Sequence, residues 1–292
     1  MARQPNLLTV DLEEWYVVEI LQNRFSFEEW PGLNSTLQRN VRRLLTVFDQ
    51  HQVRATWFVL GWCAERLPAL IDEIAERGHE IACHSFAHKR VDSMSEELFR
   101  ADTTRAIKAI ENATGVKPRG YRAPSWSINE NCSWAFRVLS ELGFQYDSSI
   151  FPIKHDLYGM PSAPRRMFKM TFEDGRTLWE VPSVPFRLLG FNLPMAGGGY
   201  LRHSPYWYTK MMIRLLNGQN LPAMVYMHPW ELDPEPPEIP GLTAVQRFRT
   251  YGSTALFLQK LDKLLRDFEF MSIGEYVNKY GRRRIGFEST HS

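Results

Sequence analysis

The chain has 292 residues, of which 23% are charged and 44% hydrophobic, and 35 Lys and Arg residues stand against 33 Asp and Glu residues. A net charge of +2 argues against general nucleic-acid binding and gives no broad attraction to an anionic membrane. A sequence pI of about 8.4 leaves weak membrane-surface association open. Cys63, Cys83 and Cys132 show no CxxC spacing; we expect reduced thiols, which favours a cytoplasmic protein.

The amino-terminal residues enter a short apolar run, Leu7 to Val10, almost at once, so we expect no secretory leader. No stretch reaches the roughly 18 consecutive apolar residues of a membrane-spanning helix. We interpret residues 1–292 as a single domain, because barrels of this length commonly form one. Its polar end, residues 281–292, is expected to be a flexible tail.

Short apolar runs bounded by polar residues predict buried strands. They lie at 7–10, 55–60, 80–83 and 224–227. Amphipathic spacing predicts helices between them, at 35–50, from the capping box Ser93-Met-Ser-Glu96 to Ala113, and at 131–142. This alternation is typical of parallel strands covered by helices.

No glycine-rich nucleotide-binding motif follows any of these strands, so a barrel or distorted barrel is favoured over a dinucleotide-binding sheet. The one glycine run, Gly197-Gly198-Gly199, follows no predicted strand and opens no predicted helix. We interpret it as a tight or close-packed loop.

Polar groups that suit catalysis follow three of the predicted strands, where α/β barrels place their active sites. Asp11 and Glu13 follow the first strand and share a face of an extended chain. His84 and His88 follow the third, and imidazoles four residues apart can reach one metal ion from a helical turn. His228 ends the late strand.

Taken singly, each group also fits a structural role, such as a solvated strand end or unrelated surface histidines. Together they suit a metal hydrolase that has a base and an acid on opposite sides of the scissile bond. Arg122, within Gly120-Tyr-Arg-Ala-Pro-Ser-Trp126, could supply a cation that keeps a carboxylate ionised.

Asp11, His84-x-x-x-His88, Arg122-x-Pro-Ser125 and His228, in this order, resemble the NodB-homology polysaccharide deacetylases, carbohydrate esterase family 4. The resemblance spans nearly the whole chain. Longer strings at 120–125, 146–152, 197–200 and 228–234 are similar to the exosortase-locus (PEP-CTERM) exopolysaccharide deacetylases. The resemblance implies a distorted (β/α) barrel with fewer than eight strands.

It also implies an enzyme that releases acetate from an N-acetylated sugar or oligosaccharide with a divalent metal, for which zinc is the family expectation. Asp11 then matches the general base, held ionised by Arg122, and His84 and His88 match two metal ligands. His228 matches the acid that protonates the departing amine.

Further roles follow from the same resemblance. Asp147 lies near the position of the carboxylate that orients the acid, and the backbone N–H of Ser125 matches an oxyanion donor. Trp126, Tyr200 and Trp230 are candidates to stack on sugar faces.

One departure from the family pattern concerns the metal. The family has two adjacent aspartates, whereas Leu12 follows Asp11 here and the next carboxylates are Glu13 and Glu14. Strand alternation favours Glu13 as the ligand. Two other readings stay open: a metal-independent cyclic amide hydrolase of the allantoinase type, and a non-catalytic glycan-binding protein.

Overall fold

The computed structural model describes residues 5–18, 21, 24–155, 158–188, 191–193 and 197–281. The predicted flexible tail therefore lies, after Gly281, outside the described residues. None of the helices within these ranges is long and apolar enough to cross a membrane.

A nine-stranded sheet organises the fold, in the order β10-β1-β2-β3-β4-β5-β7-β6, with β11 pairing with β1. The strands are β1 (Asn6–Leu12), β2 (Thr56–Val59), β3 (Glu80–Cys83), β4 (Gly120–Tyr121), β5 (Tyr146–Asp147), β6 (Phe168–Thr171), β7 (Thr177–Glu180), β10 (Met224–Met227) and β11 (Phe270–Met271). The path from β10 to β7 is parallel and has seven strands, and β6 joins it antiparallel. The fold is thus an α/β half-barrel, as expected, and the prediction of fewer than eight strands holds for its parallel path only.

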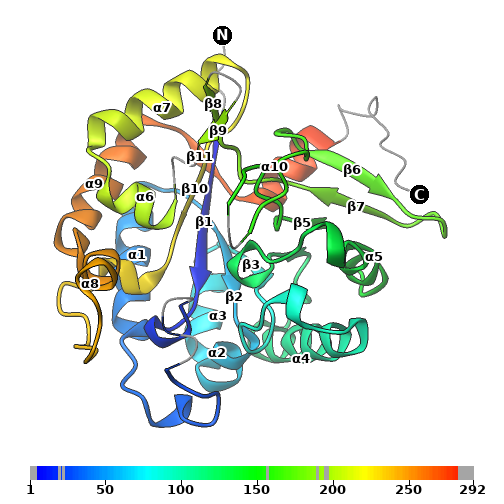
Figure 1. Cartoon of the computed structure of the whole chain (residues 1–292), viewed down its shortest axis with the longest axis horizontal. Helices are drawn as coiled ribbons and strands as arrows, with labels where there is room; N and C mark the ends of the chain where they lie inside the picture. Colours follow the sequence, from blue (N-terminus) through cyan, green and yellow to red (C-terminus); the bar gives the residue numbers. More distant parts are fainter. Residues whose placement is uncertain are drawn as a thin grey trace.

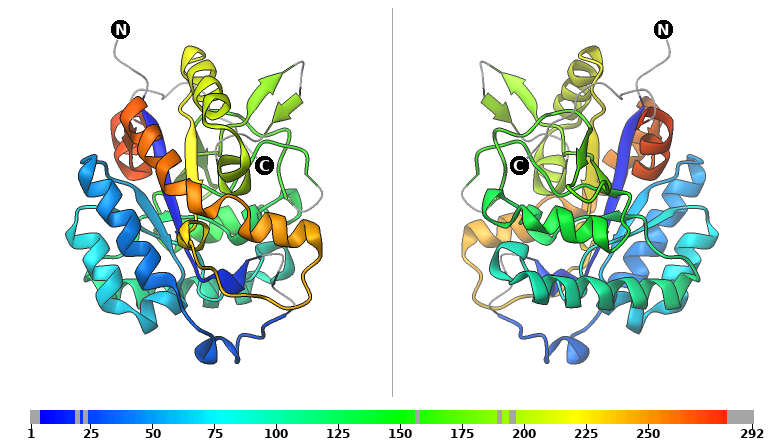
Figure 2. Two further views of the ribbon diagram at one scale, coloured as in Figure 1. Left: turned by 90° about the vertical axis from the view of Figure 1, so that its left-hand side faces the viewer. Right: turned by 90° about the vertical axis from the view of Figure 1, so that its right-hand side faces the viewer.

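Helices cover the outside of this curved sheet, as Figures 1 and 2 show. They are α1 (Leu37–Gln50), α2 (Gly61–Arg66), α3 (Pro68–Glu76), α4 (Glu96–Thr114), α5 (Trp134–Glu141), α6 (Gly198–His203), α7 (Tyr206–Gly218), α8 (Ala244–Tyr251), α9 (Thr254–Asp267) and α10 (Ile273–Tyr280). A separate hairpin pairs β8 (Phe186–Leu188) with β9 (Phe191–Leu193). Short 3₁₀ turns include η4 (Val91–Ser93), η5 (Pro124–Trp126), η6 (Glu130–Cys132) and η7 (Pro229–Leu232).

Strand β1, drawn in dark blue in Figure 1, is an interior strand of this sheet. All seven of its residues are buried, and it pairs with β10 along one side and with β2 along the other. A strand covered on both faces needs a continuous apolar run, which explains why the four strands predicted from such runs are all confirmed.

Two local predictions need correction. Helix α4 is capped by Ser95, whose hydroxyl accepts from the N–H of Leu98, so the predicted box at Ser93 and Glu96 is wrong. Ser93 ends the preceding 3₁₀ turn and donates to the carbonyl of Arg90 instead. The helix predicted at 131–142 is divided into η6 and α5 at Ser133.

The glycine run is close-packed, as predicted, but it also opens a helix that the sequence did not predict. Gly197 lies so close to the ring of Tyr226 that an added Cβ would sit 1.8 Å from a ring carbon. Gly198 then begins α6. Only glycine allows this approach of the chain to β10.

A buried histidine supports the packing of β2. His79 is 5% exposed, its Nδ1 accepts from the N–H of Ala55 at 3.2 Å, and its ring meets Phe48 and Trp57 edge-on. Burial, with a smaller contribution from Arg54, lowers its pKa from 6.5 to about 4. His79 is therefore neutral in the folded protein at neutral pH.

This histidine predicts a pH dependence of stability. His79 takes up a proton near pH 6.5 in the unfolded chain but only near pH 4 in the folded chain. Its contribution to the free energy of unfolding is therefore fully present above pH 6.5 and is lost as the pH falls toward 4. At pH 5 the loss is about 2 kcal/mol. In urea unfolding at pH 7.5 and 5, His79→Asn, which keeps an acceptor for Ala55, should lose less stability on acidification than the wild type. Equal losses would contradict this account.

Candidate metal centre

Parallel pairing brings the ends of three distant strands to one edge of the sheet. Leu12 pairs with Val59, and Val59 with Cys83, while Val10 pairs with Met227 on the other side of β1. The residues that follow these strand ends therefore meet. They include Glu13 after β1, His84 after β3 and His228 after β10.

Glu13, His84 and His88 form a buried group whose ligand atoms all lie within 4.8 Å of one another. Glu13 Oε2 is 2.8 Å from His88 Nε2 and 3.9 Å from His84 Nε2. Metal bonds of 2.0–2.2 Å place tetrahedral ligand atoms roughly 3.3–3.6 Å apart, a spacing between these two distances. Buried Oε2 also forms no hydrogen bond of acceptable geometry with a described residue. The three side chains therefore fit a divalent cation.

The histidines reach Glu13 through a loop, not through the helical turn that their spacing suggested. Ser85 and His88 both take left-handed backbone angles, with φ of 65° and 53°. The hydroxyl of Ser85 accepts from the N–H of His88 at 3.1 Å. This tight turn directs both imidazoles toward the end of β1.

His84 is held in the tautomer that a metal ligand requires. Its Nδ1 lies 2.8 Å from the carbonyl oxygen of Arg122, and because a carbonyl only accepts, Nδ1 carries the hydrogen. The lone pair of Nε2 is then free to face Glu13. Burial lowers the pKa of His84 to about 4, so the ring is neutral at neutral pH.

The two glutamates that follow Leu12, Glu13 and Glu14, have different surroundings in the structure. The carboxylate of Glu14 accepts a short hydrogen bond from the Ser35 hydroxyl, and burial raises its pKa to about 7. Burial also acts on Glu13, but His88 and His228 outweigh it and lower the pKa of Glu13 to about 2. Glu13 is thus the carboxylate that faces the imidazoles, and its role as a metal ligand stays a prediction.

Arg122 and Asp11 form an ion pair on one side of this group. The guanidinium is completely buried, and its Nη1 donates to Asp11 Oδ1 at 2.6 Å and to Thr9 Oγ1 at 2.9 Å. The ring of Phe58 lies 4.0 Å from its central carbon. A fully buried arginine requires such pairing, and the pair fixes the carboxylate beside the metal ligands.

His228 contacts both carboxylates, with its Nε2 3.9 Å from Asp11 Oδ2 and 3.7 Å from Glu13 Oε1. Its Nδ1 is 3.0 Å from Glu231 Oε2. Burial alone would lower the pKa of His228, but Glu13, Glu231 and Asp11 outweigh it and raise the pKa to about 9. The imidazole is therefore protonated at neutral pH, as a general acid must be.

Glu231 occupies the position expected for Asp147. It is completely buried, holds both the ring and the backbone N–H of His228, and lies 3.7 Å from Arg202 Nε. Asp147 accepts from the N–H and hydroxyl of Ser149 instead. The spacing His228-x-x-Glu231 resembles a capping box and was the signal that the sequence analysis missed.

The predicted sugar-binding residues fall in different surroundings. Trp230 is half-buried, and its ring stacks on that of His228 with the ring centroids 5.3 Å apart. Its indole N–H donates to Glu13 Oε1 at 3.3 Å. Trp126 is buried against the guanidinium of Arg122. Ser125 is half-buried in η5, and Tyr200 is 44% exposed on α6. Trp126 and Trp230 therefore support the charged groups directly, and sugar stacking stays a prediction.

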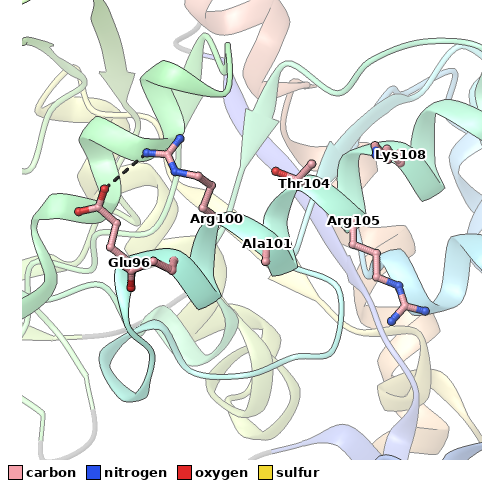
Figure 3. Close-up of a pocket in the computed structure, with 7 residues that line it drawn as sticks. Glu96, Arg100, Ala101, Thr104, Arg105 and Lys108 are labelled. Atoms are coloured by element: carbon pink, nitrogen blue, oxygen red, sulfur yellow. Dashed lines mark hydrogen bonds and ion pairs between the residues drawn. The ribbon is translucent and has the colours of Figure 1, made fainter.

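A hollow of about 550 Å³ lies away from this centre, on the outer face of α4 (Figure 3). It is lined mainly by charged side chains, and Glu96, Arg100 and Arg105 among them form ion pairs. Arg100 contacts Glu96 and Glu141, and Arg105 contacts Glu65. None of the residues lining it belongs to the metal centre.

Two sequence families match adjacent parts of the chain. Residues 25–146 match the polysaccharide deacetylase family, and residues 148–278 match a domain of unknown function (DUF3473). Glu13 precedes this deacetylase segment, His84, His88 and Arg122 lie within it, and His228 lies in the second segment. The candidate centre therefore draws on both parts.

Known relatives match this chain over part of its length and over part of their own. A peptidoglycan-N-acetylglucosamine deacetylase of Bacillus cereus is 31% identical over 111 residues, which are 38% of this chain and 38% of that protein. A peptidoglycan deacetylase of Helicobacter pylori is 29% identical over 110 residues, 38% of this chain and 36% of the relative. The matched region thus spans little more than a third of these proteins.

Solved structures share the fold over nearly the whole chain. A putative polysaccharide deacetylase from Mycobacterium smegmatis has a TM-score of 0.64 at 20% identity and covers 100% of this chain and 96% of its own. A probable polysaccharide deacetylase from Pseudomonas aeruginosa has a TM-score of 0.59 at 18% identity, over 97% and 93%. PuuE allantoinase has a TM-score of 0.60 at 16% identity, over the same shares.

The two adjacent glutamates provide a matched test of the metal centre. In equilibrium dialysis with Zn²⁺, the wild type should bind one ion per chain. Glu13→Gln should weaken binding by more than the roughly 10–100-fold that a change in the supporting shell costs. Glu14→Gln, whose side chain faces Ser35, should bind like the wild type. Equal loss in both variants would contradict the assignment of Glu13.

Proposed function

We propose that this protein hydrolyses the N-acetyl group of an amino sugar and releases acetate, using a divalent cation held by Glu13, His84 and His88. One observation carries the proposal. A carboxylate and two imidazoles converge within 4.8 Å, with the Asp11–Arg122 pair on one side and His228 on the other. The family of residues 25–146 supports the same reaction.

Asp11 is proposed as the general base. Its Oδ1 accepts from Arg122 Nη1 at 2.6 Å, and this charge-assisted bond fixes the orientation of the carboxyl group. The other oxygen, Oδ2, faces His228 and is the atom proposed to take a proton from the attacking water. A bound divalent cation would polarise the acetamide carbonyl and lower the energy of the negative charge that develops on it.

His228 is proposed to protonate the departing amine. It enters the reaction as an imidazolium, because three carboxylates surround it, and Glu231 holds its Nδ1 so that Nε2 faces the centre. The proposed base and the proposed acid are neighbours, since Asp11 Oδ2 and His228 Nε2 are 3.9 Å apart. The backbone N–H of Ser125 is proposed as a donor to the oxyanion.

The finer assignments are also proposals. Zinc suits a set of two imidazoles and one carboxylate, and the strings near 120–125 and 228–234 support an exopolysaccharide substrate. Three buried cysteines that form no disulfide support a cytoplasmic site of action. The exposed Tyr200 is the best placed of the candidate aromatic residues to stack on a sugar.

The alternative function, a metal-independent cyclic amide hydrolase, is supported by the fold that this chain shares with PuuE allantoinase. The Glu13, His84 and His88 cluster favours the metal-dependent reaction, because it is a ready set of metal ligands. Adding a metal chelator distinguishes the metal-dependent deacetylase from the metal-independent hydrolase. Acetate release from N-acetylglucosamine oligomers that stops with chelator and returns with Zn²⁺ supports the proposal. Ring opening of allantoin that chelator leaves unchanged, or oligosaccharide binding with no hydrolysis, would overturn it.

Removing either proton-transfer group should abolish most acetate release. Asp11→Asn and His228→Ala should each lower kcat by about 10²–10⁴-fold, the usual contribution of such groups. Both variants should retain the wild-type circular dichroism spectrum, which serves as the control for folding. Full activity in either folded variant would remove the role assigned to that residue.

Glu231 and Asp147 can be compared directly as partners of the acid. Glu231→Gln should lower kcat by roughly tenfold or more and change KM little, since it weakens the orientation of His228 and the stability of its imidazolium. Asp147→Asn, which alters hydrogen bonds around Ser149, should have a smaller effect on kcat. The reverse order would restore Asp147 as the orienting carboxylate.

A further inference from the structure

The exposed apolar side chains of this protein are concentrated in one part of the fold. Nine large hydrophobic residues are strongly exposed within the described ranges, and only Leu98 and Val116 lie before residue 200. The other seven are Tyr200, Trp207, Met211, Leu215, Val245, Phe248 and Leu256. They come from α6, α7, α8 and the start of α9.

Helix α7 carries three of them in one stripe. Trp207, Met211 and Leu215 follow each other at four-residue spacing, so they share one face of the helix, and they are 66%, 42% and 44% exposed. The opposite face is packed into the core through residues that include Met212 and Leu216. The solvent-facing side of a surface helix is normally polar. On α7 that side carries an apolar stripe.

The other helices extend this face. Phe248 of α8 stacks on His203 of α6 with ring centroids 4.4 Å apart, and no residue of α8 is buried. At the other end, Lys210 of α7 forms an ion pair with Asp267 of α9. The left view of Figure 2 shows these helices together on one side of the molecule. We call the stripe on α7, with Val245, Phe248 and Leu256, the outer apolar face.

Unpaired cations accompany this face. Lys210 and Arg266 are neutralised by Asp267 and Asp262. Four exposed cations of α7, α8 and α9 form no ion pair with any described residue; these are Arg214, Arg247, Arg249 and Lys263. The two anions of α7–α9 are thus already paired, and the remaining charge is positive.

We propose that the outer apolar face docks on an anionic membrane surface. It is formed by the outsides of helices, which suits a flat surface, and it combines Trp, Met, Leu and Phe with unpaired Arg and Lys, the combination by which helices bind anionic lipid. A symmetric dimer through the same face would bring these cations against each other. The face contains no residue of the metal centre, so the inference does not rest on the proposed reaction.

Vesicle co-sedimentation with the full chain tests the proposal. The wild type should bind vesicles of equal parts phosphatidylglycerol and phosphatidylcholine, bind pure phosphatidylcholine at least tenfold more weakly, and lose binding as salt rises. The triple variant Trp207→Ser, Met211→Ser, Leu215→Ser should bind the anionic vesicles at least tenfold more weakly. Arg214→Gln combined with Arg247→Gln and Arg249→Gln should weaken binding and reduce its dependence on salt.

The matched control is the double variant Leu98→Ser, Val116→Ser, which removes two equally exposed apolar residues from other surfaces and should bind like the wild type. Thermal unfolding of all variants controls for folding, because exposed substitutions cost little stability. The proposal fails if the wild type binds neither vesicle, or if the control variant loses as much binding as the triple variant. It also fails if light scattering finds a wild-type dimer that the triple variant converts to monomer.

Discussion

The buried guanidinium of Arg122 is the interaction on which the candidate centre depends. It donates to Thr9 and Asp11 of β1, while the backbone of the same residue accepts from His84 and donates to Cys83 of β3. One residue thus positions both the proposed base and a proposed metal ligand. A charge with no exposure survives in the fold only because its bonds are completed in this way, so base and ligand are held in a fixed relation.

Alternating charges extend from this pair across the centre. Asp11 is followed by His228, then by Glu231 and finally by Arg202, with successive separations of 3.9, 3.0 and 3.7 Å. Both carboxylates of this row, those of Asp11 and Glu231, therefore have a cation on each side. Glu13 is surrounded by three imidazoles and the indole of Trp230, and a divalent cation held there would add electrostatic stabilisation.

The residues of the candidate metal centre come from both sides of the boundary between the two matched families. The deacetylase segment ends beside β5, yet β10, from the second segment, pairs directly with β1 and carries His228 at its end. The second segment also forms the outer apolar face on α7 and α8. It therefore completes the proposed catalytic centre on its inner side and provides a candidate docking surface on its outer side.

The sequence by itself determined the strands and the polar residues at their ends, because fully buried parallel strands need apolar runs and the residues after them meet at one edge. Asp11, Glu13, His84 and His228 follow from that rule. Only the tertiary structure decided that Glu231 and not Asp147 contacts His228, that Ser95 caps α4, and that Trp126 is buried against Arg122. These choices depend on loop conformation and on distances between residues remote in sequence, which no local pattern of residue types records.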